Sequence, residues 1–218
     1  MTAEKDVDGA AERQTGGRRA EAARNDQRIL DAARRVFIRG GTDAPVAAIA
    51  AEAGVGIGSL YRRFPSKDAL LQHLCQQAME QSIDAAEAAL ASADAGGDAW
   101  TALAGYVRAC VGFRSGALAP VAGTFRVTEH MVATAVRNHE LGEQLVARAH
   151  AEGSLRPDVT DVDVLQLVTL FSRRELPDPG DERLLAILLD GLRAPGQTTL
   201  AGTPPQWEQI SAPWGAPG

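Results

Sequence analysis

The stretch that decides the fold covers residues 45–64 and reads PVAAIAAEAGVGIGSLYRRF. Apolar residues recur at helical spacing on both sides of Gly54, and glycine takes the left-handed conformation that ends a helix at little cost. The stretch therefore predicts two short helices joined by a glycine turn. Small residues open the second helix and Arg62 and Arg63 close it, so its outward face suits the major groove of DNA. This pattern predicts a helix-turn-helix.

The apolar residues of this stretch divide between the two predicted helices. The first starts near Pro45, and its inward positions are Val46, Ile49, Ala50 and Ala53. The second places Ile57, Leu60, Tyr61 and Phe64 on one side. Pro65 ends it, because proline cannot continue a helix, and Ser66 is a preferred N-cap for a fourth helix that runs to about residue 91.

An earlier helix is predicted to precede this stretch. From Asn25 the apolar residues follow the i, i+3, i+4, i+7 spacing of an amphipathic helix: Ile29, Ala32, Ala33, Val36 and Phe37. Gly40 and Gly41 end it. Residues 1–24 are polar and mixed in charge, and we expect them to form a disordered arm.

The rest of the chain reads as a second, helical domain over residues 76–193, after a DNA-binding domain over residues 25–75. Turn residues divide it into predicted helices near 98–113, 119–135, 139–152, 161–173 and 181–193. Residues 194–218 are rich in proline and glycine and lack periodicity, which predicts a disordered tail. The predicted fold class is all-α.

The charge of the chain is unevenly distributed. The whole sequence has 218 residues and a formal net charge of −6. Residues 25–75 hold seven basic and five acidic residues, whereas residues 76–218 hold ten and eighteen. A mildly basic segment on an acidic body fits local affinity for nucleic acid.

The sequence offers little that is typical of metal or redox chemistry. Cys75 and Cys110 are far apart and read as two reduced thiols. His130, His139 and His150 do not have the i, i+4 spacing of helical ligands, so no metal site and no cofactor are predicted. The chain begins without an apolar signal core and has no run long enough for a membrane span. We therefore expect a soluble, cytoplasmic protein with no membrane partner.

Residues 26–74 resemble the N-terminal domain of TetR-family (tetracycline-repressor-like) transcriptional regulators. The matching parts are Ile29-Leu30-Asp31-Ala32-Ala33 with Phe37 and Gly40, Ile49-Ala50 with Ala53-Gly54-Val55, Gly58-Ser59-Leu60-Tyr61 with Phe64, and Ser66-Lys67 with Leu70. The resemblance implies a homodimer that binds a palindromic operator, usually as a repressor. It also implies that a small-molecule effector binds the second domain and releases the double-stranded DNA.

Two positions depart from the commonest family pattern. Val46 stands where a threonine often begins the second helix, and Arg62-Arg63 replaces a frequent aromatic-histidine pair. The predicted DNA-binding residues are Val46, Gly56, Ile57, Gly58, Ser59, Tyr61, Arg62, Arg63, Ser66 and Lys67.

The second domain supplies candidates for an effector pocket and a dimer interface. Aromatic and polar residues of the predicted helices give the pocket candidates Trp100, Tyr106, Phe113, Phe125, His130 and Met131. The two most apolar helices must be buried, either within one subunit or against a partner. The second case predicts a four-helix interface between two subunits through Leu165, Val168, Leu184, Leu185, Leu188 and Leu192.

Other functions remain open at this point. The same fold serves activators and ligand-independent regulators. Outside the DNA-binding proteins, the alternative is a helical protein that binds small molecules and has no DNA function. An enzyme is not expected, because the chain has no nucleophile–base pair, phosphate loop or metal-ligand spacing.

Overall fold

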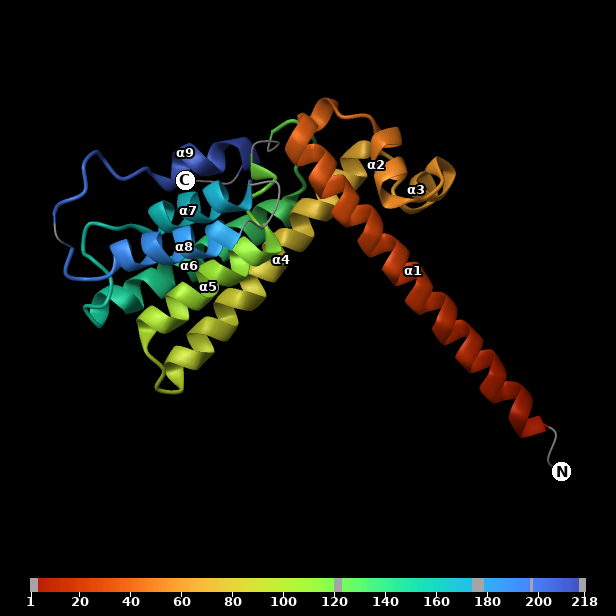
Figure 1. Ribbon diagram of the computed structural model, residues 1–218, viewed down its shortest axis with the longest axis horizontal. Helices are drawn as coiled ribbons and strands as arrows, with labels where there is room; N and C mark the ends of the chain where they lie inside the picture. Colours follow the sequence, from red (N-terminus) through yellow and green to blue (C-terminus); the bar gives the residue numbers. More distant parts are fainter. Residues whose placement is uncertain (1–3, 120–122, 174–178, 197, 216–218) are drawn as a thin grey trace. The chain divides into compact units, whose positions relative to one another are not determined.

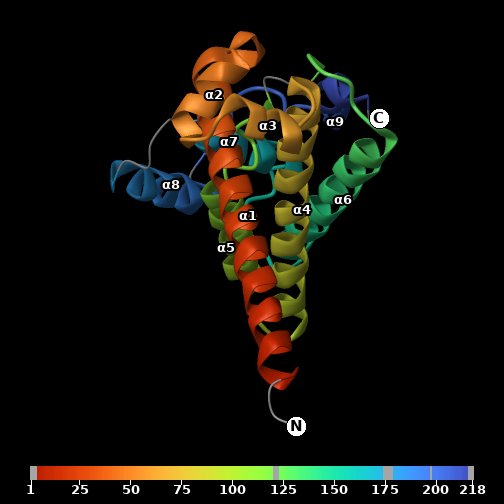
Figure 2. The same ribbon diagram turned by 90° about the vertical axis from the view of Figure 1, so that its right-hand side faces the viewer.

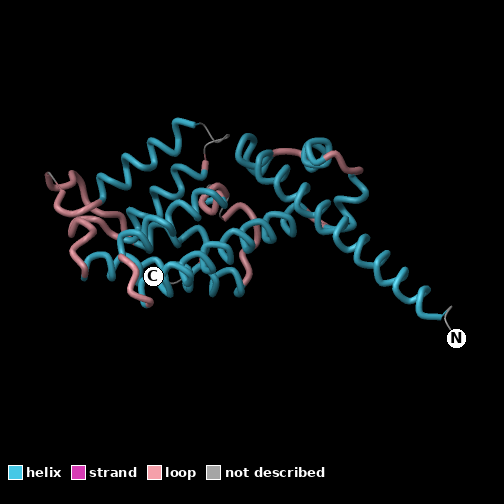
Figure 3. The backbone as a smooth tube through the Cα atoms, turned by 60° about the horizontal axis from the view of Figure 1, so that its bottom comes forward, coloured by secondary structure: helices cyan, strands magenta, loops and turns pink. Residues whose placement is uncertain are grey.

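The computed structural model describes residues 4–119, 123–173, 179–196 and 198–215. The chain divides into two compact units, Met1–Leu70 and Leu71–Gly218. Throughout the described residues the regular structure is helical, and Figure 3 shows helices and connecting loops without strands. An isolated antiparallel bridge joins Leu155 to Arg193. The all-α prediction is confirmed.

The first unit is built on one long helix and two short ones. It contains α1 (Glu4–Gly40), a 3-10 turn (Gly41–Asp43), α2 (Val46–Ala53) and α3 (Ile57–Arg63). The last turns of α1 pack against α2, and α2 packs against α3 (Figure 1). Side chains from all three helices and the residue after α3 form the core, namely Ile29, Leu30, Ala33, Phe37, Ile49, Ala53, Leu60 and Phe64.

Gly54 sets the turn between α2 and α3. It ends α2 in the left-handed region, at φ 67° and ψ 34°, and its N–H donates to the carbonyls of Ala50 and Ala51. The N–H of Val55 donates to the Ala50 carbonyl at 3.0 Å. These bonds satisfy carbonyls that the end of a helix would otherwise leave without partners, so the chain reverses in few residues.

The N-terminal residues correct the prediction of a disordered arm. The helix α1 begins at Glu4 and continues without a break to Gly40, so residues 4–24 extend the predicted helix backwards (Figure 2). Alanine, arginine and glutamate dominate this stretch, and all three have high helix propensity. Their propensity adds turns to a helix that the apolar stripe has already nucleated.

The second unit contains the remaining helices. These are most of α4 (Lys67–Asp94), then α5 (Ala99–Phe113), α6 (Glu129–Ala151), α7 (Asp161–Ser172), α8 (Pro179–Leu192) and the short α9 (Trp207–Ser211), with a final 3-10 turn (Ala212–Trp214). Helix α5 packs against both α6 and α7. The core around it includes Leu103, Val107, Leu141, Leu145, Val164 and Phe171.

Side-chain caps fix where the helices of this unit begin. The carboxylate of Asp98 accepts from the Thr101 N–H at 2.8 Å and opens α5. Thr160 opens α7 with a capping box, in which Thr160 and Asp163 each accept from the backbone N–H of the other. Caps of this kind satisfy the free N–H groups of a first turn.

Two predicted helices, 119–135 and 139–152, are one helix in the structure. The helix α6 starts at Glu129 behind the Thr128 cap and passes through residues 136–138 to Ala151. The predicted break has no physical cause, because Val136, Arg137 and Asn138 include neither proline nor glycine.

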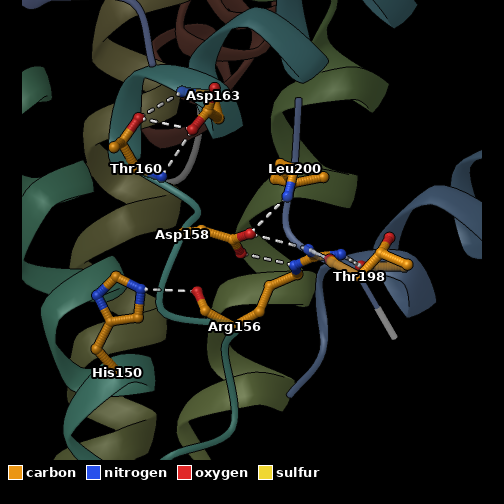
Figure 4. A network of polar contacts seen from close by, with 8 residues as sticks. His150, Arg156, Asp158, Thr160, Asp163, Thr198 and Leu200 are labelled. Carbon is orange, nitrogen blue, oxygen red and sulfur yellow. Dashed lines mark hydrogen bonds and ion pairs between the residues drawn. The ribbon is translucent and has the colours of Figure 1, made fainter. Parts of the chain in front are cut away.

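The C-terminal residues correct a second prediction of disorder. The segment 198–215, here called the C-terminal segment, contains α9 and the final 3-10 turn rather than a free tail. A buried arginine holds its beginning: the guanidinium of Arg156 donates to Asp158 at 2.8 and 3.0 Å and to the Thr198 carbonyl (Figure 4). Asp158 in turn accepts from the Leu200 N–H at 2.8 Å. Composition does not reveal such long-range bonds.

Across the described residues, no helix combines the length and apolar character that crossing a membrane would need.

Candidate nucleic-acid interface and effector cavity

The exposed face of α3 is assembled around two buried anchors. Leu60 is 1% exposed and Phe64 is 5% exposed, so these two side chains fasten α3 to the first unit. Gly56, Gly58 and Ser59 lie at the start of the helix and are exposed. A helix that opens with such small residues can bring its backbone close to base edges in a major groove.

Ile57 and Tyr61 correct the predicted inward face of α3. The apolar pattern predicts both on the same side as Leu60, yet Ile57 is 47% exposed and Tyr61 is 45% exposed. A helix of seven residues makes only about two turns. The buried anchors Leu60 and Phe64 occupy the side of α3 that packs on the unit, so no buried position is left for Ile57 and Tyr61. The two exposed side chains therefore lie on the surface that carries the predicted DNA contacts.

The two arginines of α3 have different partners. The guanidinium of Arg62 donates to the hydroxyl of Ser59 at 2.8 Å, and both residues are exposed. The Nε of Arg63 donates to Asp26 of α1 at 2.7 Å. The Arg63 guanidinium also lies 5.8 Å from the centre of the Phe64 ring. Arg62 thus belongs to the open surface, whereas Arg63 helps to join α3 to α1.

The remaining predicted DNA contacts lie at helix starts. The hydroxyl of Ser66 accepts from the Ala69 N–H at 3.0 Å and so caps α4. The Nζ of Lys67 lies 6.0 Å from the centre of the Phe37 ring. Val46 is the first residue of α2 and is half-buried. The free N–H groups of such first turns favour phosphate oxygens.

Sequence reasoning missed a carboxylate that joins α2 to α1. Glu52 accepts from the Arg35 Nε at 2.6 Å and also bonds to Arg39. The hydrogen bond from Arg35 is the main reason why the pKa of Glu52 lies below its ordinary value of 4.5. This pair of bonds fixes the packing of α2 on α1, on which the position of α3 depends.

The second unit contains a cavity of about 120 Å³. Helices α4, α5, α6 and α7, the turn after α5 and the C-terminal segment all contribute to its wall. The lining residues are Cys75, Ala78, Met79, Ser82, Tyr106, Cys110, Ser115, Gly116, Leu118, Ala119, Ala135, Asn138, His139, Gly142, Asp161, Val164, Leu165, Val168, Thr169, Trp207, Ile210 and Trp214. An apolar lining with a few polar groups is typical of small-molecule sites.

One of the six pocket candidates, Tyr106, lines this cavity. Phe113 is exposed, and His130 is exposed with its ring 3.0 Å from the Gln76 amide. Trp100, Phe125 and Met131 are buried outside the lining. Phe125 precedes α6, which begins at Glu129 and not near residue 119 as predicted. Trp100 and Phe113 lie at the two ends of α5, whose lining residues are Tyr106 and Cys110.

Other lining residues have different predicted roles or none. Both cysteines line the cavity, and burial raises the pKa of the Cys110 thiol. Trp207, Ile210 and Trp214 come from the segment predicted to be disordered. A signal was present, because two tryptophans and Ile210 in a tail rich in proline, glycine and polar residues indicate burial.

A histidine, a carboxylate and a tryptophan ring meet in the wall of the cavity. The ring of His139 lies with Nδ1 3.1 Å from a carboxylate oxygen of Asp161. The Trp207 ring stacks on the His139 ring, with centroids 3.9 Å apart and planes 6° from parallel. Next to His139 in the sequence, Asn138 has a buried side-chain oxygen without a hydrogen-bond partner.

Glu143 completes a group of three possible metal ligands with His139 and Asp161, whose ligand atoms lie within 4.8 Å of one another. Asp161 faces Nδ1 of the imidazole, whereas Glu143 faces Nε2 at 3.9 Å. One ion binds one nitrogen of a ring, so this arrangement does not present the three groups to a common centre.

The predicted dimer residues lie on α7 and α8 but face in different directions. Val168 and Leu185 are buried in the core of the unit, and Leu188 and Leu192 pack against it. Leu165 lines the cavity. Leu184 is exposed, together with Leu170 and Ile187, which lie outside the predicted set. The helix periodicity places Leu184 and Ile187 three residues apart on the same side of α8.

Comparisons with known proteins cover both units. The family model "Bacterial regulatory proteins, tetR family" matches residues 29–74. The model "Transcriptional regulator SbtR-like, C-terminal domain" matches residues 97–194. No curated protein matches the chain.

Solved structures give the same result. The TetR transcriptional regulator SCO0520 from Streptomyces coelicolor is 30% identical, with 77% of this chain and 97% of that chain covered and a TM-score of 0.50. A TetR transcription regulatory protein from Mycobacterium vanbaalenii is 27% identical, with 81% and 99% covered and a TM-score of 0.52. The regulator LfrR from Mycobacterium smegmatis, solved in complex with proflavine, is 22% identical, with 83% and 99% covered and a TM-score of 0.57, and shows the shared fold.

The exposed, glycine-flanked α3 and the helical second unit agree with these matches. TetR regulators bind DNA and are not enzymes. This chain belongs to the TetR family and is a DNA-binding transcriptional regulator.

Proposed function

We propose that the protein is a homodimeric repressor that binds a palindromic operator and leaves it when a small molecule occupies the cavity of the second unit. The cavity is the observation that supports this proposal. It is lined by four helices and the C-terminal segment, and its lining is largely apolar. A largely apolar cavity with a few polar groups is the kind of site that binds a small-molecule effector.

The residues that bind DNA have two kinds of role in this proposal. Arg62, Ser59 and the exposed Tyr61 face base edges and carry sequence preference. Ser66 and Lys67, at the start of α4, hold phosphates together with Val46 at the start of α2 and give affinity that depends on salt. Arg63 is already held by Asp26 and supports α3 from behind.

The helix α4 connects effector binding with DNA binding. Its first residue, Lys67, belongs to the DNA-binding unit, and Cys75, Met79 and Ser82 of the same helix line the cavity. An effector that contacts these side chains shifts a helix that continues into the phosphate-binding turn. If the shift changes the separation of two recognition helices, half-sites one helical turn apart no longer fit the dimer.

The dimer face consists of exposed apolar side chains of α7 and α8. Leu170 is 62% exposed and Ile187 is 56% exposed, with Leu184 beside Ile187 on α8. The exposed apolar pair Leu184 and Ile187 on one side of α8 indicates association. A twofold axis through this face would relate the α3 helices of the two subunits by symmetry. Two recognition helices related in this way bind a palindromic DNA site.

The experiment uses a cavity-filling variant. A selected operator is bound by the wild type and by Ala135→Phe, and a compound collection is screened for release of the DNA. Ala135 is buried and lines the cavity, so phenylalanine fills space that an effector would need. We expect the variant to hold the operator in the presence of compounds that release the wild type. Equal release of both proteins would overturn the proposed site, and failure of any compound to bind the folded wild type would overturn the proposed mechanism.

A further inference from the structure

The formal charge of the cavity lining is negative. With histidine counted as neutral, Asp161 is the only formally charged side chain among the described lining residues, and these include no lysine or arginine. Burial raises the pKa of the Tyr106 phenol and of the Cys110 thiol, so both stay protonated and neutral at physiological pH. The lining therefore holds one carboxylate, Asp161, whose basic neighbour is His139, and no lysine or arginine.

Two side chains of the lining, Asp161 and Asn138, offer hydrogen-bond acceptors to a ligand. One oxygen of Asp161 faces His139 at 3.1 Å, and an ionised carboxylate has further lone pairs to offer. The side-chain oxygen of Asn138 is buried and has no partner, which costs free energy unless a donor reaches it. Both groups line the cavity. A ligand that brings two or three N–H donors would satisfy them together.

The remaining walls of the cavity require a ligand with an apolar or aromatic body. Trp207, Trp214 and Tyr106 provide aromatic surface, and Val164, Leu165 and Ile210 provide aliphatic surface. Aromatic rings attract a cation as well as apolar groups. Trp207 is fixed beside the acceptors because its ring stacks on His139.

We propose that the effector is a compact apolar molecule with a protonated amine, which binds Asp161 and the side-chain oxygen of Asn138 while its body packs between Trp207, Trp214 and Tyr106. This inference rests on the proposed role of the cavity as the effector site. A carboxylate or phosphate is the wrong class, because it would be desolvated beside the Asp161 carboxylate and meet no lysine or arginine in the lining.

The test compares three probes with the same ring and chain: phenethylammonium, phenethyl alcohol and hydrocinnamate. Binding of each to the full-length protein is measured by titration calorimetry in the absence of DNA. We expect the ammonium probe to bind at least roughly tenfold more tightly than the carboxylate probe. A hydrogen bond to a charged group in a partly buried site changes Kd by about this factor. The alcohol probe should lie between them.

Three variants locate the effect. Asp161→Asn keeps the size of the side chain and leaves the Thr160–Asp163 capping box of α7 intact, so the helix start is preserved. It should remove most of the preference for the ammonium probe. Glu143→Gln is the matched control, because it removes a carboxylate that also faces His139 but lies outside the lining. It should keep the preference. Asn138→Leu should weaken the ammonium and alcohol probes alike.

Equal or tighter binding of hydrocinnamate by the wild type would overturn the inference. So would an unchanged preference in Asp161→Asn, or no binding of any probe to the folded protein. Operator release is assayed separately. If the ammonium probe binds with the expected preference but the operator stays bound, the cavity chemistry stands and the proposed release mechanism fails.

Discussion

At the scale of single residues, the adjacent arginines Arg62 and Arg63 have different partners and different roles. Arg62 bonds to Ser59 on the open face of α3, whereas Arg63 pairs with Asp26 of α1. Substituting Arg63 therefore removes an ion pair within the unit as well as a positive charge. Substituting Arg62 tests DNA recognition with less effect on the fold, because its partner is an exposed hydroxyl.

Glu52→Gln is predicted to loosen the packing of α2 on α1 in a pH-dependent way. Because Arg35 and Arg39 lower the pKa of Glu52 in the folded protein, the stabilisation is fully present above the unfolded pKa and is lost as pH falls through the folded pKa. At about pH 7 we expect the variant to lose roughly 1 kcal/mol or less of local stability, since the arginines are partly exposed.

Hydrogen exchange of the α2 amides measures this loss. The difference between wild type and variant should vanish in acid, where Glu52 is protonated in both states. Glu87→Gln, which removes an exposed partner of Arg137, is the control and should leave α2 unchanged. A difference that persists in acid would show that the ion pair is not the cause.

At the scale of elements, the C-terminal segment depends on a buried arginine. Arg156 is 7% exposed and bonds to Asp158, to the Gly191 carbonyl at 3.3 Å and to the Thr198 carbonyl. The backbone comes so close that a Cβ at Gly196 would lie 2.6 Å from the guanidinium carbon. Only glycine fits that position while Arg156 holds its place.

Arg156→Met is predicted to free the C-terminal segment. Loss of several hydrogen bonds to a charged group should make proteolysis of residues 198–206 faster by roughly tenfold or more. Arg148→Met, which removes an exposed ion pair with Asp94, is the control. If Arg156→Met is cleaved at the wild-type rate, the segment must be held by Trp207 and Trp214 alone.

Local signals explain which elements the sequence predicts correctly. Gly54 and Pro65 act through their own backbone preferences, so the turn and the end of α3 are readable from one residue each. The continuity of α6 follows from the same rule, because residues 136–138 contain neither proline nor glycine, and the predicted break there was wrong. The order of the C-terminal segment was missed because Arg156 acts across 42 positions on Thr198.

The cavity was predicted to exist but not with the correct lining. Its wall comes from four helices and two further stretches, so each residue's place depends on helix starts and rotations that a single sequence does not specify. Gly116 illustrates this: a Cβ there would lie 2.6 Å from the Cα of Thr169, an approach between distant segments that periodicity does not show. The exposed positions at the start of α3 were easier to predict, because they follow from the local glycine and serine residues of one short helix.

At the scale of the whole molecule, the proposed dimer is tested on α8. Ile187→Glu should convert the dimer to a monomer, because a carboxylate would be buried without a partner in the apolar face. Sedimentation velocity measures the mass, and the operator affinity should fall with it. Leu200→Glu, at an exposed apolar residue of the C-terminal segment, is the control and should remain dimeric. A dimeric Ile187→Glu would place the interface elsewhere.

Recognition of a palindromic site by α3 is the property on which the proposed function depends. The direct measurement is parallel selection of bound sequences from one random DNA pool with the wild type and with Arg62→Ala. We predict a palindrome for the wild type, and for the variant the same palindrome with lost preference at one symmetric pair of positions, a cost of about 1–3 kcal/mol per base contact. An identical preference at every position in both proteins, or no enriched sequence with the wild type, would contradict this role of α3.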